Sequence, residues 1–250
     1  MATAPGNSQR DNSYLAMVGD VKAELTRLQV QHRWIQTSTK DKIAFAPIDL
    51  TKDGLKVLDI GCADAQGNIR YVTQDVCDPP AEELKAQFDL THVRNVLHSS
   101  HRSGIEQAVA NLSGGWLQVM ELDITPDPPR QPQALQDLIH IIGYMFEKQG
   151  MDRDYARKIP GSMTKAGLQN VTVESVECGI GKVLGDETAI KLSIEPFMYT
   201  IPLVARNANL MCPDLDPRVV ADLENRYVKE MNEQGGYFPA KIYYAQKPLA

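Results

Sequence analysis

The stretch 58–76, LDIGCADAQGNIRYVTQDV, places two strand-like runs closer together than a parallel sheet normally allows. KVLDI, residues 56–60, is apolar and closed by Gly61, and NIRYVTQDV indicates a second strand whose core begins after Asn68. Only the seven residues 62–68 lie between Gly61 and that core. A crossover between parallel strands usually needs at least about 10–12 residues, whereas seven extended residues reach about 23 Å. Returning along a strand and stepping sideways uses nearly all of that reach, so no helix fits here.

The rest of the chain alternates strand and helix patterns. Further strands are predicted in FDLTHVRNVLHSS, WLQVMELD, NVTVESVE and AKIYYAQK, each rich in β-branched or alternating apolar residues. Apolar residues at helical spacing predict helices over 20–36, 133–149, 185–212 and 217–233. This order predicts an α/β fold with a mostly parallel sheet covered on both faces and an antiparallel C-terminal edge strand.

Composition excludes several classes of protein. The 250 residues carry a net charge of −6, which is not the basic footprint of a nucleic-acid binder. No apolar run approaches the ~20 residues of a membrane span, and the first residues lack the apolar core of a signal peptide. The four cysteines include no CxxC pair and are expected to be free thiols. We therefore expect a cytoplasmic protein with a flexible tail at 1–15 and a single domain over 16–250.

Five motifs in order resemble the class I S-adenosylmethionine-dependent methyltransferases, and most closely their fungal LaeA-like and small-molecule branch. They are VLDIGC, NIRYVTQDVCD, FDLTHVRNVLHSS, GGWLQVMELD and AGLQNVTVESVE, and they follow a QH-containing helix, LQVQHRW. The resemblance implies a Rossmann-like sheet with a helical cap formed by 20–36, 131–165 and 185–212. It also implies methyl transfer from S-adenosylmethionine to a small organic acceptor, in fungal secondary metabolism.

The resemblance assigns roles to positions in this chain. It implies cofactor contacts at Asp59, Gly61 and Ala63 around the methionine part, at Asp75 and Val76 beside the adenine, and at Arg94, Asn95 and Val96 in the loop that lines the transfer site. Methyl transfer from a sulfonium mainly requires alignment of donor and acceptor, and a base helps when the acceptor is a hydroxyl or thiol.

Histidines and acids supply the remaining candidates. His98, in the loop after a strand, is the candidate base, although a loop histidine is more often a bystander. His32 is expected to be packed within the first helix, and the histidines at 92, 98 and 101 do not have the spacing of a metal site. Asp123, beside the proline-rich stretch PDPPRQP, is expected to be a surface charge.

The short 62–68 connection departs from the resembled family, in which a helix, a second strand and another helix lie between these motifs. The second strand and its flanking helices are therefore absent here, together with the acid that normally binds the cofactor ribose. Two explanations remain open. Either the sequence omits a stretch of the natural protein, or the chain is a degenerate methyltransferase-like protein that does not use the cofactor and acts as a cyclase, an isomerase or a binding or regulatory subunit.

Overall fold

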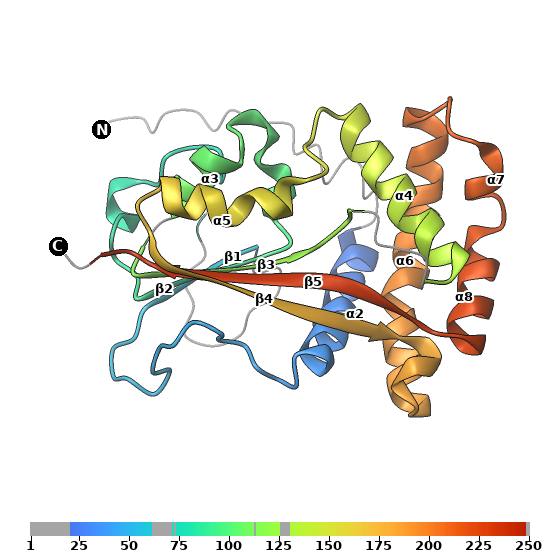
Figure 1. Cartoon of the computed structure of the whole chain (residues 1–250), viewed down its shortest axis with the longest axis horizontal. Helices are drawn as coiled ribbons and strands as arrows, with labels where there is room; N and C mark the ends of the chain where they lie inside the picture. Colours follow the sequence, from blue (N-terminus) through green and yellow to red (C-terminus); the bar gives the residue numbers. More distant parts are fainter. Residues whose placement is uncertain (1–20, 62–71, 73, 113, 126–130, 249–250) are drawn as a thin grey trace, which may run out of the picture.

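A five-stranded sheet forms the centre of the computed structural model, which describes residues 21–61, 72, 74–112, 114–125 and 131–248 (Figure 1). Its strands are β1 (Val57–Ile60), β2 (Leu90–Arg94), β3 (Trp116–Leu122), β4 (Gln169–Ile180) and β5 (Gly236–Gln246). The α-helices are α2 (Val21–Ser38), α3 (Ile105–Leu112), α4 (Gln133–Lys148), α5 (Tyr155–Lys165), α6 (Glu187–Met211), α7 (Pro217–Val220) and α8 (Leu223–Glu233). Short 3-10 helices are η1 (Glu82–Leu84), η2 (Leu97–Arg102) and η3 (Gly181–Leu184).

The strand order is β1-β2-β3-β5-β4, with β1, β2 and β3 parallel and β5 antiparallel to both of its neighbours. The α/β class, the parallel part of the sheet and the antiparallel C-terminal strand are therefore confirmed. The edge position expected for the C-terminal strand is wrong, because β5 lies between β3 and β4. The alternating sequence of β5 could not reveal this, since both edge and internal strands alternate.

The predicted second strand does not form where the structure describes it. Residues 68–71 and 73 lie outside the described residues, Val72, Gln74 and Asp75 belong to no strand, and Val76 and Cys77 form a turn. Within the described chain β1 is consequently an edge strand, paired through Asp59 opposite His92 and Ile60 opposite Val93.

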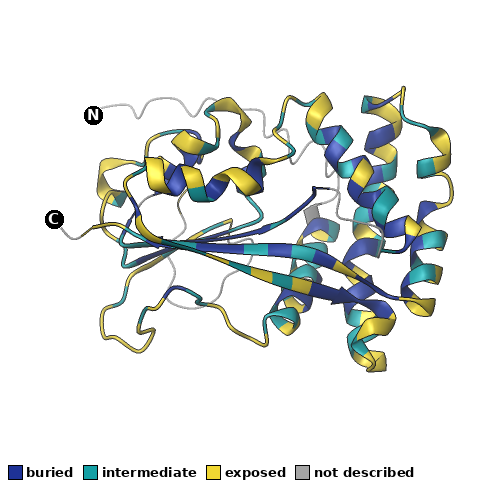
Figure 2. Cartoon of the chain, viewed as in Figure 1, coloured by how far each residue is buried: buried dark blue, intermediate teal, exposed yellow. Residues whose placement is uncertain are grey.

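Helices cover both faces of the sheet. The helices α3 and α5 lie on one face, and α2 lies on the other beside the long loop 39–56 (Figure 1). The helices α4, α6, α7 and α8 gather near the start of β5 (Figure 1), and buried residues line their facing sides (Figure 2). Since neighbouring side chains along a strand point to opposite faces, this arrangement fixes which strand residues meet which helix.

The turn before β3 depends on Gly115. Its N–H donates to the Phe88 carbonyl at 3.1 Å, and a Cβ at this position would lie 2.6 Å from the Asp89 oxygen. Only glycine allows this approach of two backbone segments. The turn thereby aligns the start of β3 with the start of β2.

An aromatic cluster joins the helical end to the sheet. Trp34 of α2 is 2% exposed, packs edge-on against Phe197 of α6 at 5.2 Å between ring centroids, and donates its indole N–H to the Gly179 carbonyl at 2.9 Å. Phe197 also contacts Tyr227 of α8 and Phe238 of β5. This cluster attaches α2 to the rest of the core.

Replacing Trp34 by Phe is expected to lower the free energy of unfolding by roughly 1–3 kcal/mol, because it leaves a cavity and an unpaired buried carbonyl. Urea unfolding measures this loss. The matched control is Trp116→Phe, which removes the more exposed tryptophan at the start of β3. An equal loss in both variants would contradict the role given to Trp34.

Candidate methyl-transfer site

Five of the predicted site residues lie at the carboxyl ends of two parallel strands: Asp59 and Gly61 at the end of β1, and Arg94, Asn95 and Val96 at the end of β2. Gly61 follows β1 with a φ of 81°, in the left-handed region that favours glycine. A Cβ at Gly61 would lie 2.6 Å from the Val96 Cγ2 atom, so the end of β1 touches the loop that follows β2. The structure thus brings Gly61 and Val96 together. Ala63 lies outside the described residues.

Asn95 shapes the loop after β2. It adopts a φ of 52°, which asparagine tolerates better than most residues. Its backbone N–H donates to the Met120 carbonyl at 3.0 Å, and its side-chain oxygen accepts from the Leu122 N–H at 3.1 Å. The Asn95 side-chain oxygen is therefore bonded to β3, and its clearest role is to fix the turn.

Asp59, Arg94 and His32 form a group on the sheet face that α2 covers. Asp59 and Arg94 attract one another electrostatically, but no ion pair within 4.0 Å and no hydrogen bond joins Arg94 to any described residue. Partial burial raises the pKa of Asp59, and Arg94 opposes this shift. Burial lowers the pKa of Arg94 from its ordinary value. Arg94 is thus a partly buried cation whose N–H donors have no partner in the described chain.

The helix α2 adds a second unpaired polar atom to this group. The Nδ1 atom of His32 is buried without a hydrogen-bond partner. Burial, and then the charge of Arg94, lower the pKa of His32. Burial likewise lowers the pKa of His92, on the same face, to about 4, and its Nδ1 atom lies 3.1 Å from the Gln118 amide. His32 was expected to be a packed, hydrogen-bonded residue, and its Nδ1 atom does not meet that expectation.

Glu121 is a site residue that sequence reasoning missed. It lies near the end of β3, is 0% exposed, and faces α5. One carboxylate oxygen accepts from the backbone N–H groups of Val96 at 3.0 Å and Leu97 at 2.9 Å, and the other accepts from the Tyr155 hydroxyl at 2.9 Å. Burial raises the pKa of Glu121 to about 7, although these three hydrogen bonds oppose the shift. The available signal was an acid on the apolar face of a strand, next in line to Leu117 and Val119.

His98 lies in an aromatic environment. Its ring stacks on Phe146 of α4 at 5.4 Å between centroids and meets Tyr155 of α5 edge-on at 6.2 Å. Burial, and then the nearby His101, lower the pKa of His98 to about 4. The imidazole is therefore neutral at physiological pH, and it is a weak base because its cation is poorly solvated.

Asp75 and Val76 lie beside η2 and α3. The Asp75 carboxylate accepts from the Cys77 N–H at 2.8 Å and pairs with Arg102 at 2.9 Å, and these contacts hold its pKa below the ordinary value against desolvation. The Val76 carbonyl accepts from the Asn111 side chain at 3.0 Å. The Asp75 side chain is thus already paired, which leaves the predicted adenine contact as a prediction.

Asp123 corrects a prediction. It was expected to be a surface charge, but it is only 6% exposed and accepts hydrogen bonds from the Thr125 N–H and hydroxyl. Arg157 of α5 approaches it, with 4.0 Å between Nε and Oδ2. A second acid therefore lies beside Glu121 at this end of β3.

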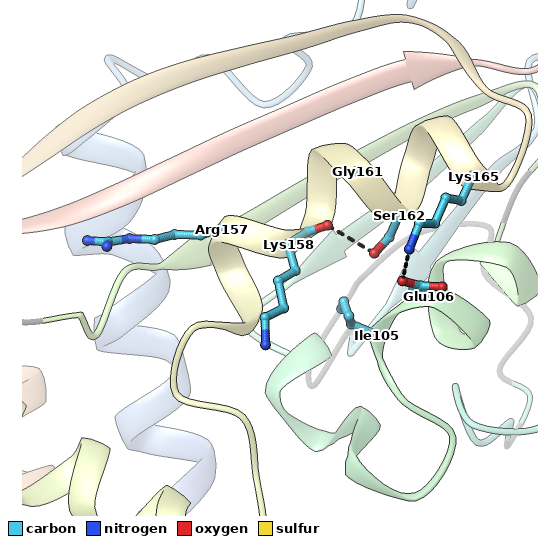
Figure 3. Close-up of a pocket in the computed structure, with 7 residues that line it drawn as sticks. All are labelled: Ile105, Glu106, Arg157, Lys158, Gly161, Ser162 and Lys165. Carbon is cyan, nitrogen blue, oxygen red and sulfur yellow. Dashed lines mark hydrogen bonds and ion pairs between the residues drawn. The ribbon is translucent and has the colours of Figure 1, made fainter.

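A cavity among the described residues lies away from these strand ends. It measures about 230 Å³ and lies between α3 and α5, where Glu106, Lys158 and Lys165 are among its lining residues (Figure 3). Lys165 pairs with Glu106, and Lys158 pairs with Asp152. Because these lysines are satisfied and no strand-end residue lines the cavity, it is not part of the site.

The described residues contain no group of three or more His, Cys, Asp or Glu side chains placed to hold a metal ion. In the same part of the chain, none of the helices has the length and apolar character needed to cross a membrane.

Over most of its length the sequence is similar to fungal proteins that are named methyltransferases, and this similarity supports a class I S-adenosylmethionine-dependent methyltransferase. No family model matches the sequence. Methyltransferase psoC of Aspergillus fumigatus is 26% identical over 258 positions, covering 90% of this chain and 94% of the relative. N-methyltransferase sirN of Leptosphaeria maculans is 26% identical over 276 positions, covering 95% of this chain and 96% of the relative.

Among solved structures, geranyl diphosphate methyltransferase in complex with SAM is similar over 97% of this chain and 93% of its own, with 12% identity and a TM-score of 0.38. The [4+2]-cyclase SpnF is similar over 72% of this chain and 57% of its own, with 17% identity and a TM-score of 0.36. Neither score is high enough to compare individual site residues.

Each of the two alignments, with psoC and with sirN, contains more positions than the number of residues that this chain contributes to it. Ninety per cent of 250 residues is about 225, so about 33 of the 258 positions shared with psoC have no residue in this chain. For sirN, 95% is about 238 residues, which leaves about 38 of 276 positions without one. The relatives thus contain residues that are absent from this chain.

Replacing Asn95 by Gly is expected to lower the free energy of unfolding by about 1 kcal/mol, because only the hydrogen bond to Leu122 is lost. Asn95→Ala loses the same bond and also places a Cβ at a positive φ, which adds about 1–2 kcal/mol. Chemical denaturation of both variants measures the difference. If alanine were no worse than glycine, the left-handed turn at Asn95 would be refuted.

The pKa of Glu121 predicts how stability depends on pH. Because this pKa is raised from 4.5 to about 7 in the folded protein, the folded state binds more protons than the unfolded state between these values. The contribution of Glu121 is therefore greatest below pH 4.5 and is lost as the pH rises towards 7, by an amount on the order of 3 kcal/mol.

Unfolding free energies of the wild type and of Glu121→Gln, measured from pH 4.5 to 8.5, test this sign. The wild type should lose stability relative to the variant up to about pH 7, and the difference should then be constant. A difference that does not change with pH would show that Glu121 does not titrate in this range.

Proposed function

We propose that the protein transfers a methyl group from S-adenosylmethionine to an oxygen, nitrogen or thiol of a small organic molecule, in fungal secondary metabolism. The observation that carries this proposal is the separated pair of charges formed by Asp59 and Arg94. The two side chains share one face of the sheet, attract one another and do not form an ion pair. A zwitterion between them would gain charge-assisted hydrogen bonds on both sides.

The amino-acid part of S-adenosylmethionine is such a zwitterion. Its carboxylate matches the guanidinium of Arg94, to which no described residue is bonded, and the Nδ1 atom of His32 when that nitrogen carries a proton. Its ammonium group matches the Asp59 carboxylate. The described residues therefore fit the methionine part of the cofactor. When bound, the cofactor supplies an electrophilic methyl group, and this chain has to orient the acceptor towards it.

The loop after β2 supplies the acceptor side of the proposed site. Gly61 and Val96 bring this loop against the end of β1, and His98 follows in a slot made by Phe146 and Tyr155. A neutral imidazole accepts a hydrogen bond from an acceptor hydroxyl or amine without repelling the positively charged donor. We therefore assign His98 to orientation of the acceptor and to proton removal, with its low pKa limiting it to acceptors that lose their proton readily.

A degenerate, non-methylating function is the second candidate. It is favoured by the edge position of β1 in the described sheet and by the aligned positions that this chain lacks. We place the missing positions in the short 62–68 connection, where the second strand and its acid are expected. Loss of that strand would remove the partner of the cofactor ribose, and Asp75 is already paired with Arg102.

Calorimetric titration with S-adenosylhomocysteine distinguishes the two functions. The transferase predicts micromolar binding to the wild type, whereas no heat at millimolar S-adenosylmethionine or S-adenosylhomocysteine would favour the degenerate function. Arg94→Gln should lower the affinity for S-adenosylhomocysteine by about 10–100-fold, because a buried ionic hydrogen bond of about 1.5–3 kcal/mol is lost.

The controls separate the carboxylate contact from general damage. Arg33→Gln removes an exposed cation from α2, one residue after His32, and should leave the affinity unchanged. Methylthioadenosine lacks the amino-acid group, so its affinity should be the same for the wild type and Arg94→Gln. An equal loss for both ligands would refute the role given to Arg94.

A further inference from the structure

The Glu121 carboxylate connects three separate parts of the site. It extends from β3, binds two consecutive N–H groups of the loop after β2, and binds the Tyr155 hydroxyl at the start of α5. Tyr155 is 4% exposed, and its ring contacts His98. Through these contacts one side chain sets the distance between the strand end, the loop and the helix.

A stability role alone does not explain a carboxylate in this position. A buried carboxylate loses its hydration, and well-packed apolar residues at such positions are often at least as stabilising. The described surroundings of Glu121 also contain no cation in contact with it. Arg157, the nearest described cation on α5, instead binds the Thr125 hydroxyl at 2.6 Å and approaches Asp123. Unusual burial of a charged group without a counter-ion is typical of functional sites.

The titratable groups facing Glu121 come from each element packed around it. They are Tyr155 from α5, Asp123 from the end of β3 and Tyr243 from β5, and Glu121 and Asp123 both raise the pKa of Tyr243. None of these groups is cationic, so the Val96, Leu97 and Tyr155 donors provide the contacts that hold the Glu121 charge. Removal of that charge should therefore weaken the hydrogen bonds from the Val96 and Leu97 N–H groups directly.

We propose that Glu121 is a positioning residue whose carboxylate holds residues 95–98 and α5 in the arrangement that aims His98 into the transfer site. The orientation of His98 towards the transfer site rests on the proposed function. The fixation of the loop by Glu121 does not depend on that function. The two N–H groups fix the backbone immediately before His98, and the Tyr155 hydroxyl fixes the ring against which His98 lies. Ionised Glu121 accepts all three bonds, whereas the protonated form gives weaker bonds to the N–H groups.

The test uses amide hydrogen exchange at Val96 and Leu97 in the full chain, corrected for the intrinsic effect of pH on exchange. Exchange is followed under conditions where the loop opens locally while Glu121 stays buried, so that opening breaks the bonds to the carboxylate without hydrating it. In the wild type, protection of both amides should then rise about tenfold between pH 6 and pH 8 as Glu121 ionises, although the free energy of global unfolding falls. Glu121→Gln should show low protection that does not change over this range. Tyr155→Phe should retain the pH dependence at lower overall protection, because only the second oxygen loses its donor.

The matched control is Glu106→Gln, which removes an exposed acid from α3 and its pair with Lys165. This control should leave protection of both amides unchanged. If Glu121→Gln and Tyr155→Phe protect Val96 and Leu97 as well as the wild type does, the proposal is overturned. If Glu121→Gln does not fold, the wild-type pH dependence and Tyr155→Phe still decide the result.

S-adenosylhomocysteine affinity supplies the second measurement. If the wild type binds this ligand, Glu121→Gln should lower the affinity for it by about tenfold at pH 8. The affinity should fall by much less at pH 6, where the wild-type carboxyl is largely protonated. A purely structural role predicts the same loss at both values and would contradict the proposal. If the wild type does not bind, the proposed function fails while the exchange measurement still tests the hold of Glu121 on the loop.

Discussion

The parallel register of β1, β2 and β3 is the constraint on which the rest of the site depends. It places Asp59 opposite His92 and His92 opposite Gln118. Asp59 and Arg94 therefore lie on the same face of the sheet, the face that α2 covers. The same register turns Val119 and Glu121 to the other face, towards α5. The strand ends therefore present two separate groups of polar residues, one on each side of the sheet. A shift of one residue would exchange them.

The sequence predicted where the strands begin and end along the chain better than it predicted which strands pair with one another in the sheet. The runs WLQVMELD, NVTVESVE and AKIYYAQK became β3, β4 and β5 because alternation reports local conformation. The insertion of β5 between β3 and β4 is a long-range outcome that alternation does not encode. In the site, the glycine and loop motifs led to Gly61 and Val96, whereas the role of Glu121 required knowing that two N–H groups and a tyrosine from elsewhere meet it.

The 62–68 connection is shorter than a crossover between parallel strands normally requires. A helix and a strand do not fit into seven residues. In the described sheet, β1 is the edge strand. Among the residues proposed to bind the methionine part, Asp59 lies on β1 and Arg94 on β2, within the described sheet, and they do not depend on what lies beyond that edge. A contact to the ribose or adenine would depend on it. A short connection after β1 would thus affect contacts to the ribose and adenine more than contacts to the methionine part of the cofactor.

The position of β5 has a consequence for the order in which the protein forms. Because β5 separates β3 from β4, residues 169–180 have no sheet partner until residues 236–246 have been synthesised. During synthesis the long, β-branched β4 segment must wait while α6, α7 and α8 are made, and an unpaired strand of this kind is prone to aggregate. Completion of the described sheet is therefore a late event, and loss of β5 would separate β4 from the three parallel strands.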